Sequence, residues 1–411
     1  MSPLRLAWQN LTLNPSRLAI AAGGVTFAVL QVFLQLGFYA SVERAATILF
    51  DRLSFDLLIV SSEYQSVTKT RDIPRERLSS AQAVSGVSYV TPLAVGSGSW
   101  RTPLLPQSAM QSVRGLSQNP EPGSSSFIFV LGLPPSAIPR VFRIGRDGVF
   151  PDLPSAEAAQ RELTRANTAL FDRTSRPEFG TYELLRDPTT IDVSPRLNGS
   201  RVDLVGECAI GTGFGWKGLL VTSEETCNDL LFRSSRNVTI GLVALEPGTD
   251  LGTVQSQLQS ALPPDVEVLT RAEVNRKETN FLLHGNPIGE LLLAGLLLAI
   301  GVGALFLYQM MSADIRNQLP AYATAKALGY GPRYLIAVVL WQAVILAVIG
   351  YLPGLLASVV MYEWTKEAAG LPMQLEVHVA IIVFVLPVLM CVGSGWLAVQ
   401  KVLRADPATL F

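Results

Sequence analysis

Four long apolar stretches interrupt the polar positions of the chain. They run from about Leu18 to Ala40, Pro287 to Met311, Tyr334 to Val360 and Val379 to Gln400. A bilayer core of about 30 Å needs roughly 20 apolar residues in a helix. Three stretches contain no Asp, Glu, Lys or Arg, and the second has only Glu290, near its start, where headgroups can solvate it. The pattern therefore predicts four transmembrane helices.

The first apolar stretch could instead be a cleaved signal peptide, because Arg5 and Arg17 precede it. It is longer than the roughly 7–15 apolar residues of a signal peptide, and no clear cleavage site follows, so we expect an uncleaved anchor. Before it, Leu4, Trp8 and Leu11 share one helical face. This spacing favours an amphipathic helix on the membrane surface over a frayed terminus.

Lys and Arg in the short loops predict the orientation of the spans, because such loops are cytoplasmic when rich in positive charge. Positive residues flank the spans at Arg5, Arg17, Arg316, Lys326, Arg333, Lys401 and Arg404. The loop between the third and fourth spans has Lys366 alone, among three glutamates. Both termini are therefore expected in the cytoplasm of a multi-pass inner (plasma) membrane protein.

The predicted organisation follows from these spans. It comprises a cytoplasmic amphipathic segment (1–17), a first span (18–40), an extracytoplasmic domain (41–286), a second span (287–311), a cytoplasmic loop (312–333), a third span (334–360), a short extracytoplasmic loop (361–378), a fourth span (379–400) and a cytoplasmic tail (401–411). The fold class is thus a four-helix membrane protein with a large α/β (α+β) domain inserted after the first helix.

The inserted domain reads as mixed α/β at its two ends. Strands are expected at 55–61, 87–93, 238–245 and 266–269, and helices at 74–84 and 254–262. Two β-α-β halves, one from each end, could pack into one lobe. The middle, about 100–235, is richer in Pro and Gly and is expected to form a second, variable and mainly β lobe.

Composition supports a membrane protein and excludes few other classes by itself. Only 16% of residues are charged and 49% are hydrophobic, against roughly 25% charged in soluble domains. The net charge of −1 gives no support to nucleic-acid binding. Cys208 and Cys227 lie in the same soluble region, where a disulfide or two buried thiols are both open.

Known catalytic patterns are missing from the sequence. The glycine-rich stretch 211–218 lacks the Walker spacing, so a glycine-rich hairpin tip is the better interpretation. We find no zinc-ligand spacing and no nucleophile elbow, and therefore predict no catalytic residue, cofactor or metal in this chain. The spans carry Gln31 and Gln35 on one face, which could hydrogen-bond across a helix interface, but no ionisable group at mid-depth. An ion-coupled transporter is thus disfavoured.

The cytoplasmic loop 312–333 carries the strongest local pattern. Pro320 can start a helix, residues 321–328 favour helix, and Gly329 can end it. A short helix tied to two spans could transmit a push, or it could simply connect them.

This loop resembles the coupling segment of FtsX/MacB-type ABC permeases, and most closely the DevC-like branch. Leu319 to Tyr330 matches the Leu-Pro-x-Tyr-Ala-Thr-x-Lys-Ala-x-Gly-Tyr pattern of that branch. The segments 33–38, 266–273 and 404–407 are also similar to family segments in the same order. Ala321 and Ala325 depart from the usual Glu and Leu. The resemblance assigns ATPase coupling to Tyr322, Thr324, Lys326, Leu328, Gly329, Tyr330 and Arg333, and Gln31 and Gln35 are candidates for a transmembrane dimer interface.

The resemblance implies a homodimer that works with a separate LolD/MacB-like ABC ATPase, which would bind ATP and Mg²⁺ because this chain has no Walker A motif. It further implies a tripartite efflux machine with a membrane-fusion HlyD-like protein and a TolC-like outer-membrane channel. The cargo would be lipid, glycolipid or another hydrophobic molecule. The alternatives are an FtsX-like regulator of an extracytoplasmic hydrolase or signalling partner, and a membrane-anchored ectoenzyme, for which no catalytic constellation is visible.

Overall fold

The computed structural model describes residues 2–13, 15–101, 125–180, 182, 185, 195–213, 215–317, 330–369 and 373–403. The chain divides into two compact units. We call Met1–Ser41 with Asn286–Phe411 the helical unit, and Val42–Gly285 the sheet unit.

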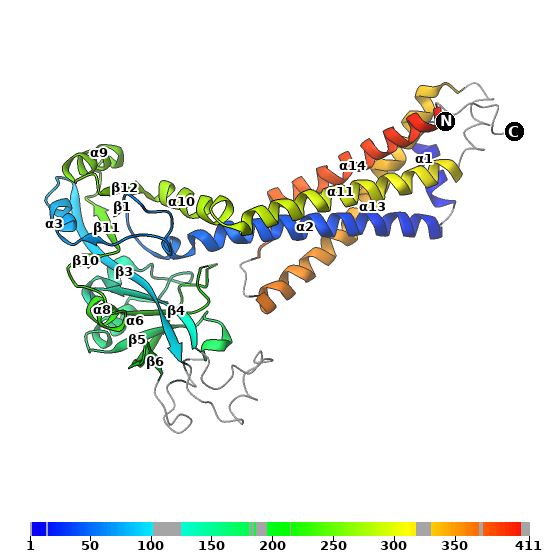
Figure 1. The fold of residues 1–411 in the computed structure, drawn as a ribbon. Helices are drawn as coiled ribbons and strands as arrows, with labels where there is room; N and C mark the ends of the chain where they lie inside the picture. Colours follow the sequence, from blue (N-terminus) through cyan, green and yellow to red (C-terminus); the bar gives the residue numbers. More distant parts are fainter. Residues whose placement is uncertain are drawn as a thin grey trace. The chain divides into compact units, whose positions relative to one another are not determined.

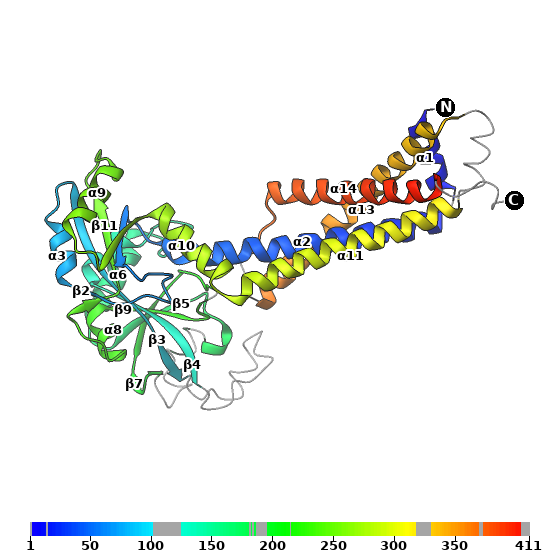
Figure 2. The ribbon, with the colours of Figure 1, turned by 45° about the horizontal axis from the view of Figure 1, so that its top comes forward.

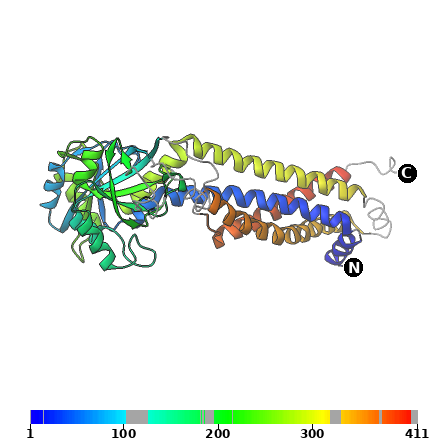
Figure 3. The same ribbon diagram turned by 90° about the horizontal axis from the view of Figure 1, so that it is seen from below.

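The helical unit contains four long apolar helices. They are α2 (Pro15–Arg52, whose last residues belong to the sheet unit), α11 (Pro287–Asn317), α13 (Pro332–Ala369) and α14 (Val377–Leu403). Each contains a stretch long and apolar enough to cross a membrane. Figures 1 and 3 show the helices of this unit running side by side. The four long apolar helices of the predicted fold class are thereby confirmed.

The N-terminal helix α1 (Pro3–Thr12) begins with proline, whose missing N–H costs nothing in the first helical turn. It packs against α13 through Ala7 and Leu11, which are buried. The side chains of Leu4 and Trp8 are 45% and 52% exposed. The buried positions are therefore fewer than the predicted apolar face, since Leu4 and Trp8 are largely exposed, although both line a pocket with Ile345 of α13.

Among the residues that the structure describes, the sheet unit is built on a ten-stranded sheet. The main path through it runs β12-β1-β11-β3-β4-β9-β5-β8. Its strands are β1 (Leu57–Ser61), β3 (Val87–Arg101), β4 (Ser125–Leu133), β5 (Thr168–Asp172), β6 (Arg196–Leu197), β7 (Ser200–Arg201), β8 (Asp203–Cys208), β9 (Leu219–Ser223), β11 (Ile240–Leu245) and β12 (Val266–Thr270), and a small separate sheet joins β2 (Ile73–Pro74) and β10 (Asn237–Val238). Figure 2 shows several of these strands and their helices.

The two ends of the sheet unit come together as predicted. Strand β1 pairs antiparallel with both β11 and β12, so residues from the two ends alternate in one sheet. Helices α3 (Glu76–Gln82) and α9 (Leu251–Ala261) accompany them. Apolar side chains from these elements, including Leu57, Leu78 and Leu258, form one buried cluster.

The described part of the middle of the sheet unit contains helices as well as the expected strands. The helices include α5 (Ile138–Val141), α6 (Leu153–Glu162) and α8 (Glu224–Leu230). The strand pairs β4/β9 and β5/β8 are parallel. Helix α6 is capped by the Asp152 carboxylate, which accepts the Ser155 N–H at 2.9 Å, and α8 is capped by the Ser223 hydroxyl. These caps and the crossover connections make the region α/β.

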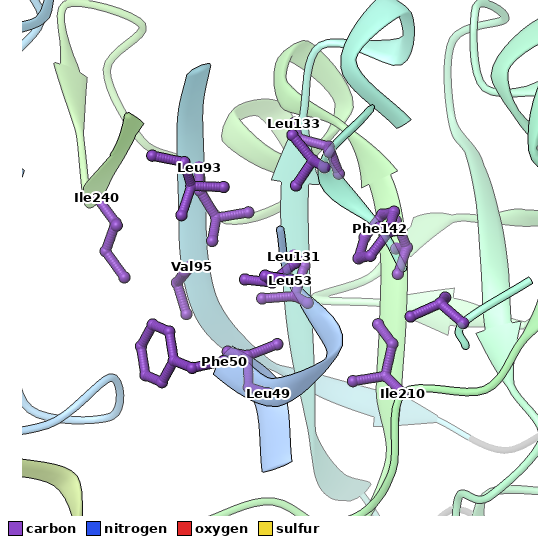
Figure 4. Close-up of a cluster of buried hydrophobic side chains, with 14 of the residues drawn as sticks. Leu49, Phe50, Leu53, Leu93, Val95, Leu131, Leu133, Phe142, Ile210 and Ile240 are labelled. Carbon is purple, nitrogen blue, oxygen red and sulfur yellow. The ribbon is translucent and has the colours of Figure 1, made fainter. Parts of the chain in front are cut away.

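The last turns of α2 lie in the largest core of the sheet unit. Leu49, Phe50 and Leu53 are fully buried there. Figure 4 shows them among the side chains of Leu93, Val95, Leu131 and Leu133. Burying a side chain of this size contributes roughly 1.5–3 kcal/mol. The end of α2 is therefore an integral part of the sheet unit.

Candidate functional site

The predicted coupling segment is only partly described. Tyr322, Thr324, Lys326, Leu328 and Gly329 lie outside the described residues. The two remaining residues flank the start of α13. The ring of Tyr330 stacks on that of Tyr334 at 4.5 Å between centroids, and Arg333 is exposed. Their role in coupling stays a prediction.

Helices α2 and α13 approach each other closely along a stripe of small residues. On α13 this stripe consists of Gly350, Gly354 and Ser358, which are four residues apart, and Tyr362 continues the same spacing. A Cβ atom on Gly350 would lie 2.5 Å from Val25 Cβ, and one on Gly354 would lie 2.6 Å from Val29 Cγ1. Only glycine permits this approach. The Gly-x-x-x-Gly spacing was visible in the sequence but was not used for the predictions above.

Polar groups reinforce the same helix pair. The Thr26 hydroxyl donates to the Gly350 carbonyl at 3.1 Å, and the Tyr362 hydroxyl donates to the Phe33 carbonyl. Tyr362 is buried. Between helices in a membrane, packing of small residues and such hydrogen bonds replace the hydrophobic effect as the source of association.

Helix α2 presents a different face to α11. A Cβ on Gly295 would lie 3.0 Å from the Gln35 amide, and one on Gly303 would lie 3.3 Å from Ala28 Cβ. The Gln35 side chain thus contacts α11 within one chain, and Gln31 is half-buried. The expected dimer interface at Gln31 and Gln35 stays a prediction.

The C-terminal end of α2 is closed by Arg271, the first residue of α10 (Arg271–His284). Its guanidinium donates to the carbonyls of Phe50 (2.6 Å), Leu53 (2.8 Å) and Phe55 (3.1 Å). It also lies over the Phe55 ring, 4.1 Å from the centroid. The last carbonyls of a helix have no partner within it, and a cation there is also favoured by the helix dipole.

Helix α10 is itself firmly started. The Thr270 hydroxyl accepts the Glu273 N–H, and the Glu273 carboxylate accepts the Thr270 N–H at 2.8 Å, which is a capping box. These hydrogen bonds lower the pKa of Glu273. Arg271 therefore joins the end of α2 to the start of α10, near the two ends of the sheet unit in sequence. Sequence reasoning missed this arginine, because its partners lie more than 200 residues away.

A buried carboxylate lies on the same helix. Glu278 is 3% exposed, and its Oε1 accepts hydrogen bonds from the Tyr64 hydroxyl and, at 2.7 Å, from the Val67 N–H. Burial raises the pKa of Glu278 to about 7, against the lowering effect of these hydrogen bonds. Burial and the neighbouring carboxylate raise the pKa of Tyr64. The sequence around Glu278 is polar and gave no signal of its burial.

The cysteines are buried and unpaired. Cys208 and Cys227 belong to different core clusters, and burial raises the pKa of the Cys227 thiol to about 12. This arrangement answers the question that the sequence left open in favour of two buried thiols. Among the described residues, no group of three or more His, Cys, Asp or Glu side chains could hold a metal ion.

The described residues of the glycine-rich stretch 211–218 turn the chain locally, but they are not the tip of a hairpin. Gly213 and Trp216 form a bridge, and the Trp216 ring stacks on Phe129 at 4.8 Å. The flanking strands β8 and β9 both pair with β5, which separates them in the sheet. The local turn was predicted correctly and the strand pairing was not.

Comparisons with known proteins identify part of the chain. The profile of the FtsX-like permease C-terminal family matches residues 293–407. No curated protein sequence matches the chain. The extracellular domain of the noncanonic ABC-type transporter YknZ from Gram-positive bacteria aligns with 53% of this chain and 99% of its own length, at 12% identity and a TM-score of 0.32. The periplasmic region of MacB from Actinobacillus actinomycetemcomitans aligns with 56% of this chain and 96% of its own length, at 10% identity and a TM-score of 0.35.

The matched residues 293–407 cover most of α11 and all of α13 and α14, and the inserted α/β domain lies between the first and second apolar helices. The profile match places residues 293–407 in the FtsX-like permease C-terminal family.

Proposed function

We propose that this chain is the permease subunit of an ATP-driven exporter that works by mechanical transmission rather than through a channel. One observation carries the proposal: α2 is a single helix from Pro15 to Arg52 whose last turns are part of the core of the sheet unit. A displacement of its membrane segment would be transmitted to the sheet unit unless the helix breaks. Arg271 would extend this transmission to α10.

The energy would come from a separate LolD/MacB-like ATPase that binds ATP and Mg²⁺ in the cytoplasm. A homodimer of the permease would engage two ATPase copies through the loop that contains Lys326 and Arg333. Both termini would then be cytoplasmic in the inner (plasma) membrane, and the sheet unit extracytoplasmic. The absence of Asp, Glu, Lys and Arg from the central part of the spans supports an external source of energy.

The machine would be tripartite, with a membrane-fusion HlyD-like protein and a TolC-like channel, and its cargo would be a lipid, a glycolipid or another hydrophobic molecule. The sheet unit would act on cargo outside the bilayer. A transmembrane regulator would use the same mechanics on an extracytoplasmic hydrolase or signalling partner, and the two functions differ in their partners.

The test is purification of the full chain from its native membrane in mild detergent, with identification of stoichiometric partners. We expect an ABC ATPase together with a membrane-fusion protein. Recovery of an ATPase together with a hydrolase or a kinase would favour the regulatory function over export. Recovery of no ATPase would overturn both functions.

A further inference from the structure

The sheet unit contains a groove of about 400 Å³ beside its terminal strand β8. One wall is a single face of α6, formed by Ser155, Ala158, Ala159 and Glu162. The lining also includes residues of the loop 145–151, Leu170 and Arg173, and the stretch 205–209 at the end of β8. The two alanines leave room between helix and strand that larger side chains would fill.

The two ends of the sheet differ in how their backbone groups are used. At β12, two glutamines of α9 occupy the outer edge. Gln259 accepts the Val268 N–H at 2.9 Å and donates to the Val266 carbonyl at 3.1 Å, and Gln255 donates to the Val268 carbonyl at 3.0 Å. Among the strands that the structure describes, β8 pairs along the sheet with β5 alone. An edge strand of this kind is a template for another strand.

The charges that line the groove are unequal. Arg146 and Arg173 are exposed near the loop end and have no ion-pair partner among the described residues. Glu162 is already paired with Arg165 at 3.0 Å. The remaining carboxylate on the lining is Glu207. Two guanidinium groups against one carboxylate favour an acidic group in the occupant.

The groove also has an apolar floor, which includes Val149, Phe150 and Leu170. A strand laid against β8 would direct alternate side chains to the same face. Every second residue of the occupant could therefore fill the space above Ala158 and Ala159. Peptide-binding domains that add a strand use this combination of a free strand edge and side-chain pockets.

We propose that the groove between α6 and β8 binds an extended segment of a partner protein, which adds as a strand to β8. The segment alternates apolar and polar residues and carries an acidic residue that faces Arg146 and Arg173. This inference depends on the sheet unit alone and holds whether the chain exports cargo or regulates a partner.

The test uses the full chain in lipid nanodiscs and a phage-displayed library of seven-residue peptides. Selection is for binding to the natural chain, with counter-selection against Ala158→Trp, which fills the groove. We expect enriched peptides that alternate apolar and polar residues and contain Asp or Glu near one end. Enrichment of no peptide that discriminates between the two chains would overturn the proposal.

Selected peptides are then synthesised and titrated. A version N-methylated at alternate residues keeps its side chains but loses ladder hydrogen bonds, and we expect it to bind at least about tenfold more weakly. Binding should protect amides of residues 203–208 from hydrogen exchange. Equal binding of the methylated peptide, or protection elsewhere alone, would exclude strand addition.

Matched variants separate the groove from the fold. Glu157→Trp places the same side chain on an exposed position of α6 outside the groove and should leave binding unchanged. Arg146→Glu with Arg173→Glu should weaken acidic peptides about tenfold or more, whereas Arg161→Glu on the same helix should not. Equal effects of Arg146→Glu/Arg173→Glu and Arg161→Glu would contradict the assigned charge recognition. The thermal midpoint of each variant reports whether it is folded.

Discussion

The Arg271 guanidinium donates to the Phe50 carbonyl at 2.6 Å, across 221 positions of sequence. The bond joins the first residue of α10 to the last turns of α2, which are the two ends of the inserted domain. Because Arg271 also reaches Leu53 and Phe55, its loss leaves several carbonyls without their charged donor. The end of α2 would then be held by apolar packing and by backbone bonds such as that from the Arg143 N–H to the Arg52 carbonyl.

Replacing Arg271 with Met should therefore weaken the junction while keeping an apolar stem. Hydrogen bonds from a charged donor contribute roughly 1.5–3 kcal/mol each, with strong overlap within one side chain. We expect a loss of about 2–4 kcal/mol in unfolding free energy of the sheet unit. Urea unfolding followed by near-UV dichroism measures it. Arg276→Met, on an exposed position of the same helix, is the control, and equal effects would remove the special role of Arg271.

The buried Glu278 predicts a pH dependence of stability. Its pKa is about 7 in the folded chain against an ordinary value of 4.5, so the folded state holds its proton more tightly than the unfolded state. The contribution is full below pH 4.5 and is lost as pH rises through about 7. The difference amounts to about 3 kcal/mol at most.

Comparison of the natural chain with Glu278→Gln isolates this effect from other titrating groups. The glutamine oxygen can still accept from Tyr64 and Val67, but it carries no charge. We expect the stability difference between the two chains to change between pH 5.5 and 8.5 in favour of the variant. A difference independent of pH over this range would show that Glu278 titrates normally.

The sequence predicted those parts of the fold that depend on local pattern. The apolar spans follow from length and composition, and β1 was visible as the continuous apolar run 57–60, which is buried throughout. Long-range relationships were not predictable in this way. Nothing local indicates that β8 and β9 are separated by β5, or that Arg271 closes a helix that ends at Arg52.

In the candidate site, too, features with a local sequence pattern were predictable and features that depend on distant contacts were not. The coupling segment was found by its resemblance to a family, and its first residues lie outside the described part of the chain. The stripe from Gly350 to Tyr362 has a recognisable spacing, but its partner helix could be read only from contacts with Val25, Val29 and Phe33. Glu278 gave no signal, because burial of a carboxylate on a polar helix depends on the packing of a distant loop.

We predict that substitutions in the coupling loop (312–333) impair transport but leave membrane insertion unchanged. Replacing Lys326 with Glu, or Gly329 with Val, should uncouple ATP hydrolysis from movement of the sheet unit while membrane insertion is unchanged. We expect a transport rate at least about tenfold lower, with the ATPase partner retained less well by Lys326→Glu. Lys366→Glu, in the last turn of α13, serves as the charge control. Unchanged transport in both Lys326→Glu and Gly329→Val would remove the assignment of this loop.

We predict that adding a single methyl group at a glycine of α13 lowers the stability of the helical unit. Gly354→Ala adds one methyl group whose carbon would lie 2.6 Å from Val29 Cγ1, so α2 and α13 must separate or shift. Overpacking of this kind costs typically about 1–3 kcal/mol. The separation would also weaken the hydrogen bonds from Thr26 and Tyr362.

The matched control for this prediction is Gly301→Ala in α11, where an added Cβ meets nothing within 4 Å. In a helix interior, Gly→Ala without a clash is expected to be neutral or stabilising by up to about 1 kcal/mol. Unfolding of purified protein by increasing fractions of sodium dodecyl sulfate measures both variants. Because propensity favours alanine at both positions, opposite signs can arise only from packing, and equal signs would mean that α2 and α13 are not held by the glycine stripe.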